Sequence, residues 1–245
     1  VGVDTREGML KEAIDHNNNS TINTNGTDDK PAKITYELKK AEDLTDKVAT
    51  FDRAYCHQGV QFFEDRKKAL DNIWRSLKPG AHFQCAIWAP VKGQLLFEVM
   101  RDCLIECGRE EWVPVLLKPF SFAGGKSRVE SVDLLERVLI DAKFENVDVV
   151  FEEGDVTFAT LDEALKVISV APFGQELVEN KELYEKFTRK FKSKMLSANM
   201  DGDYNINAKA KSGTVNADEC TFKMMSFFAH CNKPWAGVNN SSFKC

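Results

Sequence analysis

The alternation of helix-type and strand-type apolar patterns is the feature that most constrains the fold of this chain. The clearest helix pattern places apolar residues at i, i+3, i+4 and i+7, namely Leu70, Ile73, Trp74 and Leu77. The run Lys78-Pro79-Gly80 predicts that this helix ends there, and residues 82–88 then alternate as a strand. Strands that alternate with helices predict an α/β fold, a three-layer sandwich around a mostly parallel sheet.

Weaker patterns extend this prediction along the chain. Strands are expected at residues 1–4, 34–38 and 51–56, and helices after Thr5, over 94–107, after Ser131, after Thr160 and over about 176–196. Residues 147–151 and 156–158 flank the turn-like Glu153-Gly154-Asp155, which predicts a hairpin. The sheet therefore gains an antiparallel edge.

The domain boundary is placed at residue 196. Residues 1–196 carry the strand and helix patterns, whereas residues 197–245 lose periodicity and form a poorly determined C-terminal tail. Residues 17–31 are almost wholly polar and are expected to form a loop.

Composition excludes several classes of protein. Hydrophobic residues make up 43% and charged residues 29% of the 245-residue chain, which is typical of a globular protein. A net charge of -5 lacks the basic footprint that nucleic-acid binding requires. The longest apolar stretch, residues 83–91, is too short to span a bilayer. Seven cysteines without close pairing favour a reducing compartment, and no secretory leader is visible, so a cytoplasmic protein is expected.

Three pieces of the sequence, taken in order, resemble one family. They are Val1-Gly2-Val3-Asp4 with the Glu7-Gly8-Met9-Leu10 that follows, then Ala41-Glu42-Asp43-Leu44, and then residues 51–88, which include Phe51-Asp52-Arg53-Ala54-Tyr55-Cys56 and Leu77-Lys78-Pro79-Gly80. Together they resemble the class I S-adenosylmethionine-dependent methyltransferases. Within that class they are most similar to the small-molecule branch that includes ubiquinone and menaquinone biosynthesis enzymes (methyltransferase type 11). The resemblance covers about residues 1–195.

The resemblance implies a Rossmann-like fold, S-adenosylmethionine as cofactor and a small-molecule methyl acceptor. It implies a set of cofactor-binding residues in three places: Asp4, Thr5 and Met9; Ala41, Glu42 and Asp43; and Cys56 and His57. An acid that ends a strand can accept hydrogen bonds from ribose hydroxyls, which suits Asp4. The alternatives remain that Asp4 caps a helix, that Met9 is a core residue and that residues 41–43 form a solvated acidic turn.

No catalytic residue is assigned. His57 is the best candidate for a general base, because a neutral imidazole can accept a proton near neutral pH. Methyl transfer from a sulfonium mostly needs alignment, however, so His57 could equally line the cofactor or pack. Where the family usually has an acid before the alanine, this chain has Lys40, which offers no acceptor, so Glu42 or Asp43 must replace it or adenine recognition is weakened.

The resemblance also implies that the family's first strand and the glycine-rich turn after it are missing, so that the domain is truncated at its N-terminus. Gly124-Gly125 does not replace that turn, because it does not lie between a strand and a helix. Such a chain is expected to bind the cofactor poorly or not at all.

Other constellations favour ordinary packing. Cys103 and Cys107 are spaced to share a helix face, and buried inert thiols are expected there. Zinc is disfavoured, because the tail residues Cys220, His230, Cys231 and Cys245 form no paired hooks. The acceptor pocket is expected to be formed by Trp88, the loop over residues 118–125 and the helix after Pro90. The aromatic residues Trp112, Phe120 and Phe122 favour an apolar or planar acceptor.

The sequence therefore predicts S-adenosylmethionine-dependent methyl transfer to a small organic acceptor. Two alternatives stay open. One is a catalytically inactive methyltransferase-like remnant that acts as a binding module, which Lys40 and the missing glycine turn favour. The other is a nucleotide-dependent oxidoreductase, which the lack of a Tyr-x-x-x-Lys pair disfavours.

Overall fold

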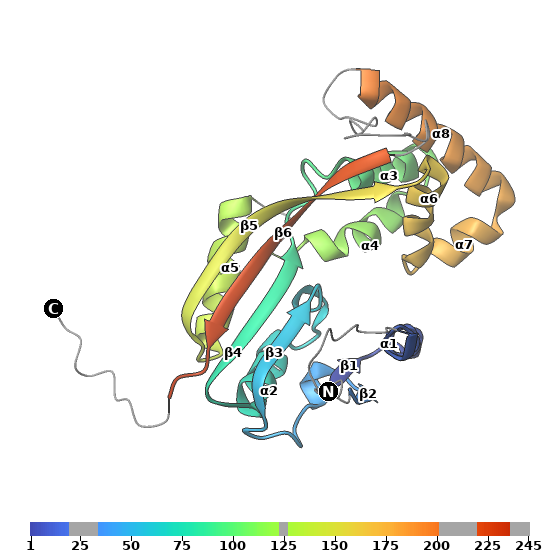
Figure 1. The fold of residues 1–245 in the computed structure, drawn as a ribbon. Coiled ribbons are helices and arrows are strands. Elements are labelled where there is room, and N and C mark those ends of the chain that lie inside the picture. Colours follow the sequence, from blue (N-terminus) through green and yellow to red (C-terminus); the bar gives the residue numbers. More distant parts are fainter. Residues whose placement is uncertain (20–33, 123–126, 201–219, 236–245) are drawn as a thin grey trace, which may run out of the picture.

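The computed structural model describes residues 1–19, 34–122, 127–200 and 220–235, and it is an α/β structure with a mixed sheet (Figure 1). The α/β class expected from the sequence is thus confirmed. The predicted polar loop at 17–31 lies mostly outside the described residues, as does Gly124-Gly125.

A four-stranded sheet forms the centre of the molecule. It contains β3 (Phe51–His57), β4 (Leu77–Trp88), β6 (Cys220–Asn232) and β5 (Glu145–Phe158), in that spatial order. β3 and β4 are parallel, whereas β6 is antiparallel to both β4 and β5. The parallel part of the sheet therefore ends at β4, and the expected antiparallel edge follows it.

A separate two-stranded sheet lies at the N-terminus. β1 (Gly2–Asp4) is parallel to β2 (Tyr36–Leu38), and α1 (Glu7–Asn19) follows β1 along the chain. A side chain at Gly2 would meet the Tyr36 ring, since a Cβ there would lie 3.0 Å from it. The Tyr36 hydroxyl donates to the carbonyl oxygen of Ala13 on α1, at 3.3 Å, so this ring joins both strands to the helix.

Helices cover one face of the four-stranded sheet. α2 (Arg66–Ser76) and α5 (Arg128–Asp141) pack against inward side chains such as Phe83, Ile87 and Phe227, which are fully buried. Side chains of the opposite face, including Tyr55 and Phe228, are exposed. In the described part of the chain, this sheet thus carries one of the two helical layers that a three-layer sandwich contains.

A second apolar core lies among helices at the far ends of β5 and β6 (Figure 1). Its helices are α3 (Leu95–Glu106), α4 (Val113–Leu117), α6 (Leu161–Leu165), α7 (Gly174–Glu179) and α8 (Lys181–Met200). The four-residue spacing on α8 is confirmed as its buried face: Leu183, Phe187, Phe191 and Met195. In the described residues, no helix combines the length and the apolar character needed to span a membrane.

The predicted helix over 176–196 is two helices. The break lies at Asn180, whose side-chain oxygen accepts a hydrogen bond from the backbone nitrogen of Leu183 at 3.1 Å. A side-chain acceptor at this position satisfies an N–H group that the first turn of a helix leaves free. α8 therefore begins anew after Asn180.

The predicted hairpin at 147–158 is wrong. β5 runs without a turn through Glu153, Gly154 and Asp155, which pair with Met225, Met224 and Lys223 of β6. Residues of turn type can remain extended where a partner strand satisfies their backbone groups. The antiparallel edge exists, but its partner strand comes from a distant part of the sequence.

That partner lies in the segment expected to be a tail. Residues 220–232 form β6 between β4 and β5, where Phe227 pairs with Ile87 on one side and Phe151 on the other. A strand with neighbours on both sides belongs to the sheet, so the fold extends well past residue 196. The irregular order of apolar residues in this segment hides the two-residue strand period.

Two helix boundaries also differ from the prediction. Ser127, rather than Ser131, caps α5, because Ser127 and Glu130 form a reciprocal capping box and Ser131 is buried inside the helix. Lys78-Pro79-Gly80 lies within β4 rather than between the helix and the strand. The predicted Thr160 cap is confirmed, since its hydroxyl accepts from the Glu163 nitrogen at 3.1 Å.

The central place of β6 predicts unequal effects of two neighbouring phenylalanines. Phe227→Ala removes a ring that is 0% exposed and contacts Phe151, so unfolding free energy should fall by about 3–5 kcal/mol. Phe228→Ala makes the same change on the outer face, where the ring is 39% exposed, and should cost less than about 1 kcal/mol. Denaturant unfolding of both variants measures this. Equal losses would contradict the assignment of the two faces.

An ion-pair cluster between α3 and α8 predicts acid sensitivity. The Glu106 carboxylate accepts from Lys190 at 2.6 Å and lies 2.7 Å from Lys194, and these partners lower its pKa from 4.5 to about 2. Since the folded pKa is the lower one, the stabilisation exists above the unfolded pKa and disappears as pH falls through the folded one. The stability difference between the natural protein and Glu106→Gln should therefore shrink below about pH 4.5.

Unfolding midpoints measured from pH 7 down to the acid limit of folding test this dependence. Glu110→Gln is the matched control, because Glu110 is exposed and has no ion pair among the described residues. A difference for Glu106→Gln that stays constant with pH would show that the cluster does not stabilise the fold electrostatically.

Candidate functional site

The first candidate residue, Asp4, ends β1 and is half-buried. Its Oδ1 atom accepts a hydrogen bond from the backbone nitrogen of Arg6 at 2.7 Å, just before α1 begins. Among the described residues, the structure records no other hydrogen bond or ion pair to this carboxylate. One oxygen of Asp4 therefore caps the chain locally, and the other can accept a hydrogen bond from a ligand.

Thr5 and Met9 follow Asp4 but contribute no built pocket. Both side chains are exposed, and Met9 retains 49% of its accessible surface. Met9 is thus not a core residue. Its exposed thioether stays available for a ligand that lies against the start of α1.

The second candidate group, Ala41, Glu42 and Asp43, forms a 3₁₀ turn after β2. The backbone of β1 and the chain after β2 are joined, because the Lys39 nitrogen donates to the Asp4 carbonyl oxygen at 2.9 Å. The Asn72 side chain on α2 holds the turn by donating to the carbonyl oxygens of Ala41 and Glu42, at 3.2 and 2.8 Å. Asp4 and this turn therefore lie together at the carboxyl ends of the two parallel strands β1 and β2.

Glu42 and Asp43 differ in what their carboxylates do. Glu42 is 8% exposed, and its Oε1 atom accepts from the backbone nitrogens of Glu64 and Asp65 at 2.9 and 3.3 Å. This carboxylate fastens the turn to the start of α2. Asp43 is exposed and lies 3.8 Å from the Lys68 ammonium, so it is the more accessible acceptor of the two.

Lys40 has a partner of its own. Its ammonium donates to the Glu64 carboxylate at 2.9 Å, which raises the pKa of Lys40 and lowers that of Glu64. Both side chains are exposed, so the pair adds little stability. The position before the alanine is thus occupied by a cation that is already paired.

The third candidate group lies on β3 in the other sheet. His57 is exposed at the end of β3 and contributes to a hollow of about 310 Å³ on the open face of the sheet. Cys56 borders the same hollow, but burial raises the pKa of its thiol to about 11. Cys56 therefore remains a neutral thiol near neutral pH and supplies no thiolate.

Other residues around this hollow did not stand out in the sequence as site residues. The Gln84 amide lies 3.0 Å from the His230 Nδ1 atom, and these side chains border the hollow with Tyr55 and Phe228. They come from β3, β4 and β6, so their proximity depends on the pairing of β6. A signal for His230 could have been found only by recognising β6 as a strand.

The structure thus collects the candidate residues into two groups. Asp4 and residues 41–43 share one edge of the two-stranded sheet, whereas Cys56 and His57 belong to the edge strand of the four-stranded sheet. The hollow contains the second group and not the first. The two groups are connected through Glu42, whose carboxylate binds the chain between β3 and α2.

The aromatic residues expected to form an acceptor pocket are packed instead. Trp112, Phe120 and Phe122 are each less than 10% exposed. The Phe120 ring lies 4.6 Å from Phe97, and Trp112 stacks on Phe173 at 4.9 Å. Apolar rings that find such neighbours belong to the core. These three rings therefore line no open pocket in the described part of the chain, and residues 123–125 of the expected pocket loop lie outside the described residues.

Cys103 on α3 and Cys107, which directly follows this helix, are packing residues as well. Cys103 is buried and Cys107 is half-buried, and burial raises both pKa values, that of Cys103 to about 12. Across the described residues, no group of three or more histidine, cysteine or acidic side chains is placed to hold a metal. Cys245 lies outside that part of the chain.

The carboxylates of Asp4 and Asp43 can bind part of S-adenosylmethionine, namely its nucleoside. A half-buried carboxylate at a strand end, with an available oxygen, suits the adjacent hydroxyls of a ribose, and the exposed Asp43 can accept from an amino group. Within the described residues, no glycine-rich turn joins a strand to a helix, so the methionine end lacks a backbone cradle here.

The comparisons with known proteins bear on the same N-terminal residues. Residues 1–85 match the family model described as a methyltransferase domain (Methyltransf_11). No curated protein sequence matches the chain.

Solved structures give weaker likenesses. YcgJ protein from Bacillus subtilis is 13% identical over 95% of this chain and 81% of its own, with a TM-score of 0.49. A SAM-dependent methyltransferase from Methanosarcina mazei is 13% identical over 96% and 81%, with a TM-score of 0.48. Phosphoethanolamine N-methyltransferase 2 from Haemonchus contortus, in complex with S-adenosyl-L-methionine, is 17% identical over 95% and 43%, with a TM-score of 0.46.

Because these TM-scores are all below 0.5, the structural similarities do not indicate a function. The similarity to methyltransferases depends on the sequence match, which includes Asp4, residues 41–43 and the Cys56-His57 pair. The matched segment, residues 1–85, is thus similar to a methyltransferase domain and covers about a third of the 245-residue chain.

Proposed function

We propose that this protein transfers a methyl group from S-adenosylmethionine to a small organic acceptor. The observation that carries the proposal is the half-buried Asp4 carboxylate, placed at a strand end inside the segment that matches a methyltransferase domain. The net charge of -5 argues against a nucleic-acid acceptor. A cytoplasmic location is part of the same proposal.

Asp4 and the turn at 41–43 hold the nucleoside in this proposal. The available Asp4 oxygen accepts from ribose hydroxyls, and Asp43 with the turn backbone meets the adenine edge. Glu42 acts as a positioning residue, because its carboxylate keeps the turn attached to the chain before α2. When bound, S-adenosylmethionine would supply a methyl group on a sulfonium: the acceptor would take the methyl group in line, and S-adenosylhomocysteine would leave as the neutral thioether.

The hollow beside His57 is the proposed place for the acceptor. Its volume of about 310 Å³ is at the lower end of small-molecule sites. Tyr55 and Phe228 offer apolar surface, whereas His57, Gln84 and His230 offer hydrogen-bonding groups. His57 either accepts a proton from the acceptor or orients it by a hydrogen bond, and both roles need an exposed imidazole.

A strand between the two sheets is a related expectation. Among the described residues, β1 pairs only with β2, and β3 pairs only with β4, so each has one edge without a strand partner. Unpaired strand edges are commonly covered by another strand. These edges support the expected first strand, whose following turn would complete the cofactor site between the two groups of residues.

The alternative function is a catalytically inactive, methyltransferase-like binding module. Two observations favour it. The Lys40 ammonium stands where an adenine acceptor is expected, and the buried Glu42 carboxylate is occupied by backbone nitrogens. Asp43 is left as the acceptor in this turn, and its exposed carboxylate lies 3.8 Å from the Lys68 ammonium, so adenine recognition through it is weak.

Cofactor titration distinguishes the two functions. Asp4→Ala removes the hydrogen-bond acceptor for ribose and should weaken S-adenosylhomocysteine binding about tenfold or more, since hydrogen bonds to charged groups contribute roughly 1.5–3 kcal/mol. Calorimetry on the 245-residue chain, and on a longer product wherever the gene encodes residues before Val1, measures the affinity. Asp15→Ala is the matched control, because Asp15 is an exposed acid on α1, and binding should not change.

If neither the 245-residue chain nor such a longer product binds the cofactor, the enzyme proposal fails and the binding-module alternative stands. If Asp4→Ala and Asp15→Ala weaken binding equally, the Asp4 carboxylate does not hold the ribose. Transfer of an isotope-labelled methyl group to small-molecule extracts then identifies the acceptor class.

The positioning role of Glu42 predicts a loss of stability. Glu42→Ala leaves the backbone nitrogens of Glu64 and Asp65 without their acceptor, so unfolding free energy should fall by about 1–3 kcal/mol. Asp43→Ala removes the neighbouring, exposed acid and should change it by less than about 0.5 kcal/mol. Denaturant unfolding of both variants measures the difference. A larger loss for Asp43→Ala would reverse the assigned roles.

A further inference from the structure

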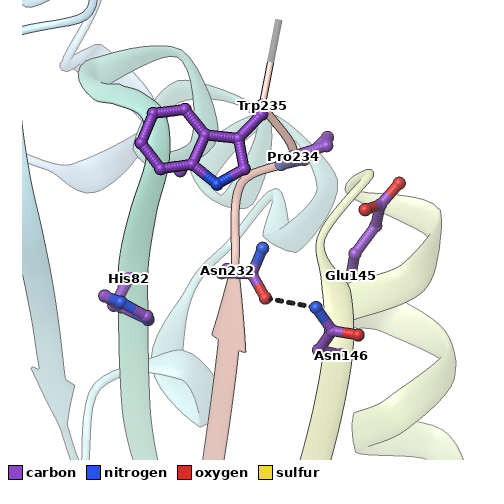
Figure 2. A pocket seen from close by; sticks show the side chains of 7 residues that line it. His82, Glu145, Asn146, Asn232, Pro234 and Trp235 are labelled. Carbon is purple, nitrogen blue, oxygen red and sulfur yellow. Dashed lines mark hydrogen bonds between the residues drawn. The ribbon is translucent and has the colours of Figure 1, made fainter. Parts of the chain in front are cut away.

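A second pocket lies at the opposite end of the four-stranded sheet from the carboxyl ends of β3 and β4. It has a volume of about 380 Å³ and is formed at the starts of β4 and β5 and at the end of β6. Figure 2 shows the side chains around it: His82, Glu145, Asn146, Asn232, Pro234 and Trp235. None of these residues takes part in the proposed methyl transfer.

The Trp235 ring is exposed and yet fixed in place. It keeps 68% of its accessible surface, while its other side lies against the backbone of Gly80. A Cβ at Gly80 would lie 2.4 Å from the indole, and the backbone there has a φ of +77°, which favours glycine. Hydrogen bonds between Gly80 and Lys233, and between Lys233 and Ala81, hold the chain beside it at 2.9 and 2.8 Å. The pocket thus contains a preorganised indole with one open face.

Two amide side chains form the polar part of the pocket. The Asn146 Nδ2 atom donates to the Asn232 Oδ1 atom at 2.8 Å (Figure 2). This bond orients both amides, and the described residues provide no hydrogen bond to the Asn146 carbonyl oxygen. The Asn232 Nδ2 atom makes one long bond, 3.4 Å, to the Lys233 carbonyl oxygen. The pair therefore offers an acceptor and donors side by side.

The chemistry of the pocket suits a neutral ligand. Among the described residues that line it, no lysine or arginine is present to attract a phosphate or carboxylate group. The His82 ring is already stacked on His230, with 5.2 Å between ring centroids, so it does not form a second wall for a flat aromatic ligand. A ligand here needs one face of C–H groups for the indole and adjacent hydroxyls for the amides.

We propose that this pocket binds a neutral sugar ring. The C–H face of the ring lies on the Trp235 indole, and neighbouring hydroxyls bond to the Asn146 and Asn232 amides. An open pocket with a single aromatic platform gives weak binding, with a dissociation constant of roughly 1–10 mM for an isolated ring. The site would attach the protein to a sugar-bearing molecule, separately from the edge that holds the cofactor residues.

Nuclear magnetic resonance titration with methyl β-D-glucopyranoside, methyl β-D-galactopyranoside and methyl α-D-mannopyranoside tests the proposal. At least one of these probes should shift the Trp235 indole N–H signal and the Asn146 and Asn232 side-chain amide signals together. Glucose 6-phosphate should not shift them more at equal concentration, because no lysine or arginine side chain among the described residues lines the pocket to bind its phosphate. Nicotinamide, a flat ring without hydroxyls, should shift them less than the sugars.

Three variants locate the binding site. Trp235→Ala should abolish the shifts of the amide signals, and Gly80→Ala should weaken binding about tenfold by displacing the indole. Tyr55→Ala is the matched control, because this ring is also exposed, at 65%, but borders the hollow on the sheet face. Unfolding midpoints near that of the natural protein show that each variant is folded.

Several outcomes overturn the proposal: no probe shifts these signals, nicotinamide or glucose 6-phosphate shifts them more than the sugars, or Tyr55→Ala removes sugar binding while Trp235→Ala keeps it. These outcomes are independent of cofactor titration, because the Asp4 site can bind or fail to bind whatever happens at Trp235.

Discussion

The pairing of β6 with β4 on one side and β5 on the other is the interaction on which the rest of the structure depends. A buried strand must satisfy its backbone N–H and C=O groups, and β6 does so for itself and for the facing edges of both neighbours. It also supplies Phe227 to the core beneath the sheet and Phe222 to the core among the helices. The long strands β5 and β6 therefore join the two apolar cores, and Phe122, which follows α3 and α4 of the second core, also packs in the first.

The sequence correctly predicted the features that depend on interactions between residues close together in the chain. The helix spacing of α2, the buried face of α8 and the Thr160 cap depend on residues within a few positions of one another, and all are present. β6 could not be predicted in the same way, because both of its faces carry apolar residues and its partners lie more than 60 residues away in sequence. The predicted hairpin failed for the same reason: Gly154 resembles a turn residue until a partner strand lies beside it.

The candidate site shows a comparable limit for charged residues. The sequence indicates which positions carry carboxylates, but not which oxygens stay available. Asp4 uses one oxygen for the Arg6 nitrogen, whereas Glu42 has its Oε1 atom shared by two backbone nitrogens in a nearly buried position. Acids a short distance apart at one sheet edge thus perform different tasks, one suited to a ligand and one to holding a turn. A motif match alone would assign both to the cofactor.

The Trp235 pocket and the hollow at His57 lie along the same strand, β4. Gly80 and His82 lie at its start, beside the Trp235 pocket, while Cys85 and Ala86 lie near its end, beside the hollow at His57. β4 is hydrogen-bonded to a neighbour on both sides over residues 82–86, so this part of the strand is rigid and does not transmit a shift as a loop would. Side chains nevertheless connect the two places. The His82 ring of the pocket stacks on His230, with 5.2 Å between ring centroids, and the His230 Nδ1 atom lies 3.0 Å from the Gln84 amide at the hollow. A ligand in the Trp235 pocket can therefore affect the hollow at His57 through the His82–His230 stack, whereas the paired backbone of β4 stays in place.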